Sequence, residues 1–337
     1  MKTLDQLVDK ALSRRTFLAG AGAVAASTVV AGCSDTNSTP PPANNGLYTD
    51  ADVLNFALNL EYLEAQFYLY AATGAGLASS DTSAPSGYTG KFTEGTLTVG
   101  SAAQVAGLTT AEQEIVNEIA YEEMTHVKFL RTALGTAAVP MPDIDLSFFG
   151  PLAVAAGITT AATGAGSFNP FSSFDYFLVG AFIFEDVGVT AYSGAAPLIS
   201  AAGVTAGFLT AAAGILAVEA YHAGYVRTSL TGRAIAAGSA GYPYLPAANL
   251  VEALRATLTV GNSAAPSTTG SVETTLVVPT STSTPSAIVA ASPTSAVGFS
   301  RTVNQVHHIV YGSPTVGVAK GGFFPSGTNS IFATTTA

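Results

Sequence analysis

Two copies of the motif Glu-x-x-His constrain the fold of this chain more than any other feature. They span Glu123–His126 and Glu219–His222, in a chain with only four histidines. Residues three apart lie on the same face of a helix, so the Glu and His of each motif can reach one metal ion. Two further acids, one of Glu61 or Glu64 and then Glu185, complete the ligand order of a two-metal site in a four-helix bundle.

The sequence around each of these acids has the pattern of a helix. Apolar residues recur at helical spacing on both sides of Glu61 and of Glu123, and Thr110 with Gln113 has the spacing of a capping box. The predicted helices cover residues 49–72, 110–134, 172–193 and 204–231. A long link at 136–171 joins the second helix to the third, as a bundle with one crossover requires. The expected fold is therefore an all-α four-helix bundle.

The surroundings of the last two acids favour a metal partner. Glu185 follows the strongly apolar segment 174–184, and Glu219 follows the uncharged segment 208–218. A carboxylate in such surroundings is costly unless a partner compensates its charge. Mixed carboxylate and imidazole donors suit iron and manganese, and zinc is chemically possible.

The same segments resemble a known superfamily. Residues 59–68, Asn-Leu-Glu-Tyr-Leu-Glu-Ala-Gln-Phe-Tyr, are similar to the first helix of ferritin-like proteins, where a metal-binding Glu precedes a Tyr by seven residues. Residues 121–126 and 219–222 resemble the second-helix and fourth-helix ligands of bacterioferritin-type and rubrerythrin-type proteins. More narrowly, residues 54–64 and 321–325 resemble the ferritin-like family of plant desiccation-related proteins and their bacterial relatives. The likeness covers roughly residues 48–232, with a weaker echo at 298–326.

This resemblance implies a ferritin-like fold and a dinuclear centre of two iron or two manganese ions. It selects Glu61 rather than Glu64, and it implies the following ligand set: Glu61, Glu123, His126, Glu185, Glu219 and His222. Within that set it implies that Glu123 and Glu219 bridge the two ions, which leaves Glu61 and Glu185 terminal.

Other polar side chains are expected beside the ligands or away from them. Tyr68 is a candidate neighbour of the ligands, and Glu64 lies either on the helix surface or beside the ligands. Asp186 is placed to orient a ligand histidine or to face solvent. We expect Glu122 to face solvent, one position off the ligand face. The pair at 307–308 lies far from either Glu-x-x-His motif and is interpreted as structural.

The N-terminus has the features of an export signal. Residues 13–18, Ser-Arg-Arg-Thr-Phe-Leu, form a twin-arginine motif around Arg14 and Arg15, and an apolar stretch follows. The stretch ends in Val-Ala-Gly-Cys33, the form of a lipoprotein cleavage box. We therefore expect the folded chain to pass through the twin-arginine translocase. A lipid on Cys33 would then anchor it to a membrane in the periplasm or envelope.

Two alternatives remain for this segment, an ordinary signal peptide and a single membrane-spanning anchor. The apolar stretch is short and rich in Gly and Ala for a span. Cys33 is the one cysteine of the chain, which excludes an internal disulfide and catalysis by a thiol in the folded domain. The long uncharged stretch at 187–218 is broken by Pro and Gly, so we interpret it as two bundle helices and a loop rather than a span.

Composition organises the rest of the chain. Residues 1–33 form the signal, 34–47 a Pro-rich and Asn-rich linker, 48–232 the bundle, and 233–337 an irregular Ser/Thr/Pro-rich extension. We also expect a small hairpin at 91–99 and short helices at 249–258 and 301–311. Without the signal, eight basic and 20 acidic residues remain. No basic run occurs, which argues against a nucleic-acid-binding surface.

Three functions fit these predictions. The first is an exported di-iron or di-manganese oxidoreductase acting on Fe(II), O2 or peroxide in stress protection, a direction that comes from the family. With no cysteine cluster for a second redox centre, any electron donor would be external. The second is a metal-binding or structural envelope protein without enzymatic activity, including a bundle that binds no metal. Iron storage in a cage fits least, because long insertions, the extension and a lipid anchor suit a closed shell poorly.

Overall fold

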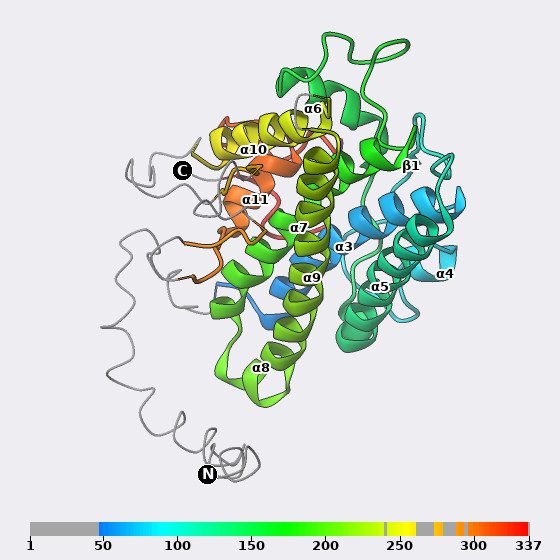
Figure 1. Ribbon diagram of the computed structural model, residues 1–337. Helices are drawn as coiled ribbons and strands as arrows, with labels where there is room; N and C mark the ends of the chain where they lie inside the picture. Colours follow the sequence, from blue (N-terminus) through cyan, green and yellow to red (C-terminus); the bar gives the residue numbers. More distant parts are fainter. Residues whose placement is uncertain (1–46, 239–240, 261–272, 279–287, 293–295, 336–337) are drawn as a thin grey trace, which may run out of the picture. The chain divides into compact units, whose positions relative to one another are not determined.

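The computed structural model describes residues 47–238, 241–260, 273–278, 288–292 and 296–335 (Figure 1). Its four long helices are α3 (Asp50–Thr73), α5 (Thr110–Leu134), α7 (Phe174–Ala195) and α9 (Phe208–Ala236). α3 packs along α5 and α7 along α9, and contacts between α3 and α7 join the two pairs. The predicted all-α bundle is confirmed. The predicted signal and most of the predicted linker lie outside the described residues.

Local sequence sets where the first two helices begin. The Thr49 side chain accepts a hydrogen bond from the backbone N–H of Asp52, whose carboxylate accepts one from the N–H of Thr49. α5 begins with the same capping box, formed by Thr109 and Glu112. The predicted box at Thr110 was therefore one residue late. The predicted range of α5 itself is confirmed.

The links on either side of α5 contact each other. The shorter elements in them are α4 (Ser79–Thr82), β1 (Leu97–Thr98), η2 (Gly135–Ala137), β2 (Ile144–Asp145), η3 (Leu146–Phe148) and α6 (Phe149–Ala155). β1 pairs in parallel with β2, so the predicted hairpin at 91–99 is wrong. The Asp143 carboxylate accepts hydrogen bonds from the backbone N–H and the hydroxyl of Thr96 and holds this long-range pairing.

The uncharged stretch at 187–218 is interrupted as predicted. A 3-10 turn, η4 (Ala196–Leu198), and a short helix, α8 (Ala201–Thr205), separate α7 from α9. Among the described helices, none is both long enough and apolar enough to cross a membrane.

Both short helices predicted in the extension, at 249–258 and 301–311, are present, and the first is longer than predicted. The extension contains α10 (Tyr244–Val260) and α11 (Val303–Val310), both of which pack against α7. Arg255 and Arg301 of this region are 2% and 1% exposed. α7 is thus enclosed by the bundle on one side and by the extension on another.

Aromatic side chains fill the space between α3, α6, α7 and the extension. Phe67 of α3 stacks on Phe177 of α7 and meets Phe149 and Phe184. Phe323 of the extension contacts Phe149 and Phe184 from its own side. Offset and edge contacts of this kind stabilise by about 0.5–1.5 kcal/mol each beyond the area that they bury.

The histidine pair of the extension is built into the core. His307 stacks on Tyr311, meets the edge of Phe56, and lies 3.2 Å from the Thr328 hydroxyl. Burial lowers the pKa of His307 to about 3, which makes the ring neutral. His308 makes a hydrogen bond with the backbone oxygen of Ser313. These contacts are those of packed core side chains.

Candidate metal centre

Each of the four long helices supplies part of one buried polar cluster in the bundle. α3 carries Glu61, α5 carries Glu123 and His126, α7 carries Glu185, and α9 carries Glu219 and His222. All of these side chains are buried, with His126 the most exposed at 7%. The structure thus brings together the full set of ligands that the sequence predicts.

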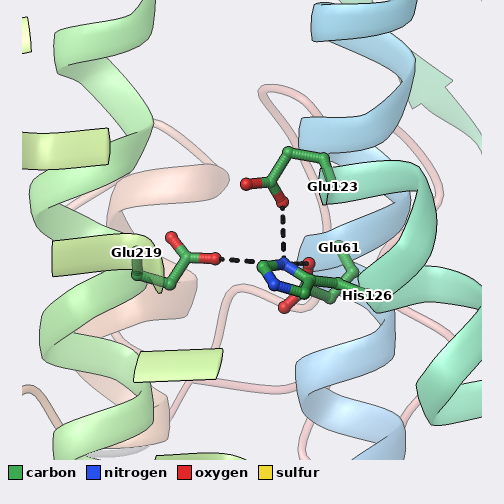
Figure 2. A group of neighbouring side chains, drawn as sticks. All are labelled: Glu61, Glu123, His126 and Glu219. Atoms are coloured by element: carbon green, nitrogen blue, oxygen red, sulfur yellow. Dashed lines mark hydrogen bonds and ion pairs between the residues drawn. The ribbon is translucent and has the colours of Figure 1, made fainter. Parts of the chain in front are cut away.

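One half of the cluster is arranged around His126 (Figure 2). Its Nδ1 lies 3.2 Å from Oε2 of Glu61 and 3.3 Å from Oε2 of Glu123. Oε1 of Glu219 is 3.7 Å away. Two atoms bound at right angles to one ion, each at about 2.1 Å, lie about 3 Å apart. The four side chains are therefore spaced like ligands of a single ion.

The other half is arranged around His222. Its Nδ1 lies 2.9 Å from Oε1 of Glu123 and 3.6 Å from Oε2 of Glu185. Glu123 therefore turns one oxygen toward each histidine. That is the arrangement of a bridging carboxylate, and it gives the cluster two metal positions that share Glu123.

Several atoms of the cluster are buried without a hydrogen bond. Among the described residues they include Oε1 of Glu123, Oε2 of Glu185, both oxygens of Glu219, and Nδ1 of His222. Nδ1 of His222 and Oε1 of Glu123 do not form a hydrogen bond with each other despite their 2.9 Å separation. Buried polar atoms left in this way are costly. A cation between them would satisfy them, so the residues fit a metal centre.

Burial and the charges of neighbouring residues shift the pKa values of the cluster, which favours protons on some of its members near neutral pH. Burial would lower the pKa of His126, but Glu61 and Glu123 raise it to about 12. Burial raises the pKa of Glu61 to about 7, against the lowering effect of His126. Burial would also raise the pKa of Glu123, but the neighbouring His126 and His222 lower it well below its ordinary value. Binding of metal ions would displace these protons.

Two tyrosines hold the carboxylates of Glu61 and Glu185 in place. The Tyr68 hydroxyl of α3 donates to Oε1 of Glu185 on α7. The Tyr192 hydroxyl of α7 donates to Oε1 of Glu61 on α3. Tyr68 was expected beside the ligands, whereas Tyr192 was missed. Its signal was present in the sequence, since Tyr192 follows Glu185 by seven residues just as Tyr68 follows Glu61.

Glu122 does not simply face solvent. Its carboxylate is 36% exposed, and one oxygen lies 2.6 Å from Nε2 of His222. Because the other ring nitrogen of His222 faces the cluster, this contact fixes the orientation of the imidazole. Carboxylates on the outer nitrogen of a metal-binding histidine commonly have this role.

Asp186 neither contacts a ligand histidine nor faces solvent, the two positions expected from the sequence. It is 3% exposed, and Oδ2 pairs with Nη1 of Arg227 at 2.7 Å and with Nη2 of Arg255 at 3.0 Å. It therefore orients no ligand histidine and is not solvated. On a helix, a residue next to a ligand points about a quarter turn away from it, here toward α10 and the extension.

Glu64 lies with the cluster rather than on the surface. It is 5% exposed, one turn after Glu61 on α3. Burial raises its pKa well above the ordinary value, and the charges of Glu123, Glu61 and Glu185 add to that effect. The cluster thus holds five carboxylates.

Fold and site together define a helical bundle with a buried carboxylate and histidine cluster that suits a pair of metal ions. Residues 49–232 match the model of the ferritin-like domain family. The chain belongs to this ferritin-like family.

Two curated proteins are similar to this chain in sequence at about 30% identity. The chain is 29% identical over 186 residues to the desiccation-related protein PCC13-62 of Craterostigma plantagineum, which covers 55% of the chain and 54% of that protein. It is 30% identical over 155 residues to the ferritin-like catalase Nec2 of Nesocodon mauritianus, which covers 44% of each. The chain spans about half the length of these relatives. No solved structure matches the chain significantly.

Proposed function

We propose that this chain binds two iron or two manganese ions and uses them to break down hydrogen peroxide. The observation that carries the proposal is the position of Glu123, whose two oxygens each face one ligand histidine within 3.3 Å. The chemistry of the donors, carboxylates with one imidazole per ion, suits iron or manganese better than a soft metal.

The choice of peroxide rests on the relative that is named a ferritin-like catalase. In such a reaction one peroxide is reduced to two molecules of water while a second is oxidised to O2. The two half-reactions exchange two electrons and two protons, so no external electron donor is needed. The bound ions would supply the change of oxidation state.

The side chains around the centre would keep the ligand carboxylates ionised and would hold the ligands in place. Tyr192 donates to Glu61 and Tyr68 to Glu185, so each terminal carboxylate keeps one oxygen fixed while the other faces the ion. The Glu122 carboxylate does the same for His222. Tyr68 also packs against Phe177, part of the apolar shell that excludes bulk water from this side of the centre.

Metal analysis and a catalase assay test this proposal together. The purified chain should contain about two ions of iron or manganese and should release O2 from peroxide. Replacing Glu123 with Gln should abolish both properties and leave the helix content unchanged. A chain that binds two ions and releases no O2 would refute the peroxide activity. A chain that binds no ions after anaerobic loading with Fe(II) or Mn(II) would refute the metal centre as well.

A second function is a metal-binding or structural envelope protein without turnover. It is favoured by the relative named a desiccation-related protein, a name that specifies no reaction. Under this alternative, loading with metal raises the thermal stability of the chain and peroxide is left intact.

We also propose that the chain is exported and lipid-anchored. The support is the sequence alone, Arg14 and Arg15 in the twin-arginine motif and Cys33 in the cleavage box. Replacing both arginines with Lys should leave the protein in the cytoplasm of a bacterial host. Replacing Cys33 with Ser should release the exported protein from the membrane. Membrane attachment that survives the serine substitution would contradict lipidation.

A further inference from the structure

Three acidic side chains follow one another along α5, one helical turn apart. They are Glu114, Glu118 and Glu122, and we call them the acidic row. Residues at this spacing are neighbours on a helix surface, with about 5–6 Å between their Cβ atoms. Glu114 and Glu118 are exposed, and the Glu122 carboxylate is 36% exposed. The acidic row therefore runs along the outside of α5.

The first two acids of the row have no basic partner among the described residues. Neither Glu114 nor Glu118 forms an ion pair or a side-chain hydrogen bond there. The two basic residues of α5, Lys128 and Arg131, contact groups outside the row. α9 has no Lys or Arg before the buried Arg227. Like charges one turn apart destabilise a helix, and a cation held between them would relieve the repulsion.

The row ends one imidazole ring away from the metal centre. An oxygen of Glu122 lies 2.6 Å from Nε2 of His222, and Nδ1 of the same ring lies 2.9 Å from Oε1 of Glu123. This Nδ1 and this Oε1 are both buried without a hydrogen bond. The outer end of this series of contacts is thus a carboxylate at the surface, and its inner end is a pair of atoms that a cation would satisfy.

The ligands come closest to solvent on the side of the bundle formed by α5 and α9. His126 and His222 are 7% and 5% exposed, whereas each ligand glutamate is 0% or 1% exposed. α5 and α9 pack along each other less closely than α3 with α5 or α7 with α9. Between α3 and α7 the space is filled by Tyr68, Tyr192 and the rings around Phe67. The side of α5 and α9 is therefore the one most open to an ion from solvent.

We propose that the acidic row is an entry path for divalent cations, along which Fe(II) or Mn(II) approaches the centre between α5 and α9. The inference rests on the proposed metal centre. Glu114 and Glu118 attract the hydrated cation from solution, and Glu122 brings it to the ring of His222. Because the first two acids lie outside the ligand set, they govern how fast the ions bind and leave their final number unchanged.

The test is the rate at which the metal-free full chain takes up Mn(II) after rapid mixing, measured by the loss of the electron paramagnetic resonance signal of free Mn(II). Glu114→Gln/Glu118→Gln removes two charges of the row and leaves Glu122 and every ligand in place. A unit negative charge about 10 Å from a divalent cation raises the local cation concentration about fourfold in water.

Two such charges predict a clear kinetic effect. At about 10 mM ionic strength, where the screening length is about 30 Å, the variant should take up Mn(II) about tenfold more slowly. It should reach the same final number of ions per chain. At about 1 M salt, where the screening length is about 3 Å, the variant and the unaltered chain should load at equal rates. Slowing that persists at high salt would contradict electrostatic attraction by the row.

Glu94→Gln/Glu252→Gln is the matched control, because it removes the same net charge outside α5. Each of these two carboxylates accepts a hydrogen bond from a threonine hydroxyl, which a glutamine oxygen can also accept. The control should load as the unaltered chain does. Equal slowing in the control would assign the effect to overall charge and overturn the path.

The remaining outcomes separate the path from the centre. An unchanged rate in the row variant at low salt, with full loading of both chains, would overturn the path and leave the centre standing. A lower final number of ions in the folded row variant would mean that these acids bind the resident ions, which also overturns the path. If the unaltered chain binds no Mn(II), the metal centre itself fails, and the path fails with it.

Discussion

The buried ion pairs of Asp186 give a stability prediction that separates support of the fold from binding of metal. Asp186 lies next to the ligand Glu185, yet its carboxylate contacts Arg227 and Arg255 instead of the cluster. Replacing Asp186 with Asn removes one negative charge and changes the shape of the side chain little. The variant should lose stability and keep both metal ions.

The size of the effect follows from the charges around it. Asp186 and Glu273 face three buried guanidinium groups, those of Arg227, Arg255 and Arg301. Burial and the charge of Arg255 both lower the pKa of Arg301, a sign that positive charge is concentrated here. Removing one partner of a buried pair costs about 3–5 kcal/mol. We expect the free energy of unfolding to fall by that amount.

The assay is urea denaturation followed by circular dichroism and tyrosine fluorescence, since the chain has 13 Tyr and no Trp. Asp175→Asn is the matched control on the same helix. Asp175 pairs with Arg233, whose side chain is 39% exposed. Exposed pairs contribute about 0.2–1 kcal/mol, so the control should unfold nearly as the unaltered chain does.

Two results would refute this reasoning. Equal and small losses in both variants would mean that the buried network contributes no more than a surface pair. Loss of metal from a fully folded Asp186→Asn chain would mean that Asp186 acts on a ligand after all.

Three further predictions concern the centre itself. Gly188→Ala should lose metal yet remain folded, because the new Cβ would displace the Glu219 carboxylate. Gly224→Ala is the control, because a Cβ added at Gly224 meets open space. Full metal content in Gly188→Ala would contradict this geometry. Tyr192→Phe should weaken metal binding about tenfold by freeing Glu61, whereas Tyr221→Phe, at a residue 77% exposed, should not. Loading should release protons, because in the metal-free chain the pKa of Glu61 is raised to about 7 and that of His126 to about 12. The apparent affinity should therefore rise with pH through about pH 7, and a pH-independent affinity would refute the protonated metal-free state.

The sequence predicted those parts of the structure that depend on local spacing. Glu123 and His126 are one helical turn apart, so a helix alone places them on the same face. The range of α5 follows from its apolar periodicity, and only its cap shifted, because Thr109 and Thr110 each have a suitable partner three residues later.

Pairings between distant segments could not be read in this way. β1 pairs with β2 from the other side of α5, and nothing near residues 97–98 identifies that partner. The buried network joins Asp186 to Glu273 and Arg301 through α10, and nothing near these residues in the sequence predicts that they pair. The sequence does not show that these charged residues are buried, because their burial depends on where the extension packs.

Tyr192 could have been found from the sequence. The two Glu-x-x-His motifs already indicate a bundle whose halves correspond, and this correspondence extends to α3 and α7. Applying the spacing of Glu61 and Tyr68 to Glu185 gives residue 192, which is a tyrosine. The structure shows why the spacing is shared, since each tyrosine reaches the terminal carboxylate of the other helix.

The places where this correspondence fails are those at which the two ions can differ. Glu64 on α3 corresponds to Gly188 on α7, and the Glu122 carboxylate holds the outer nitrogen of His222. The second of these departures acts on the position of Glu185 and His222, because it fixes the imidazole. Four side chains converge on the position of His126 and three on that of His222, so the two ions should bind in sequence rather than together.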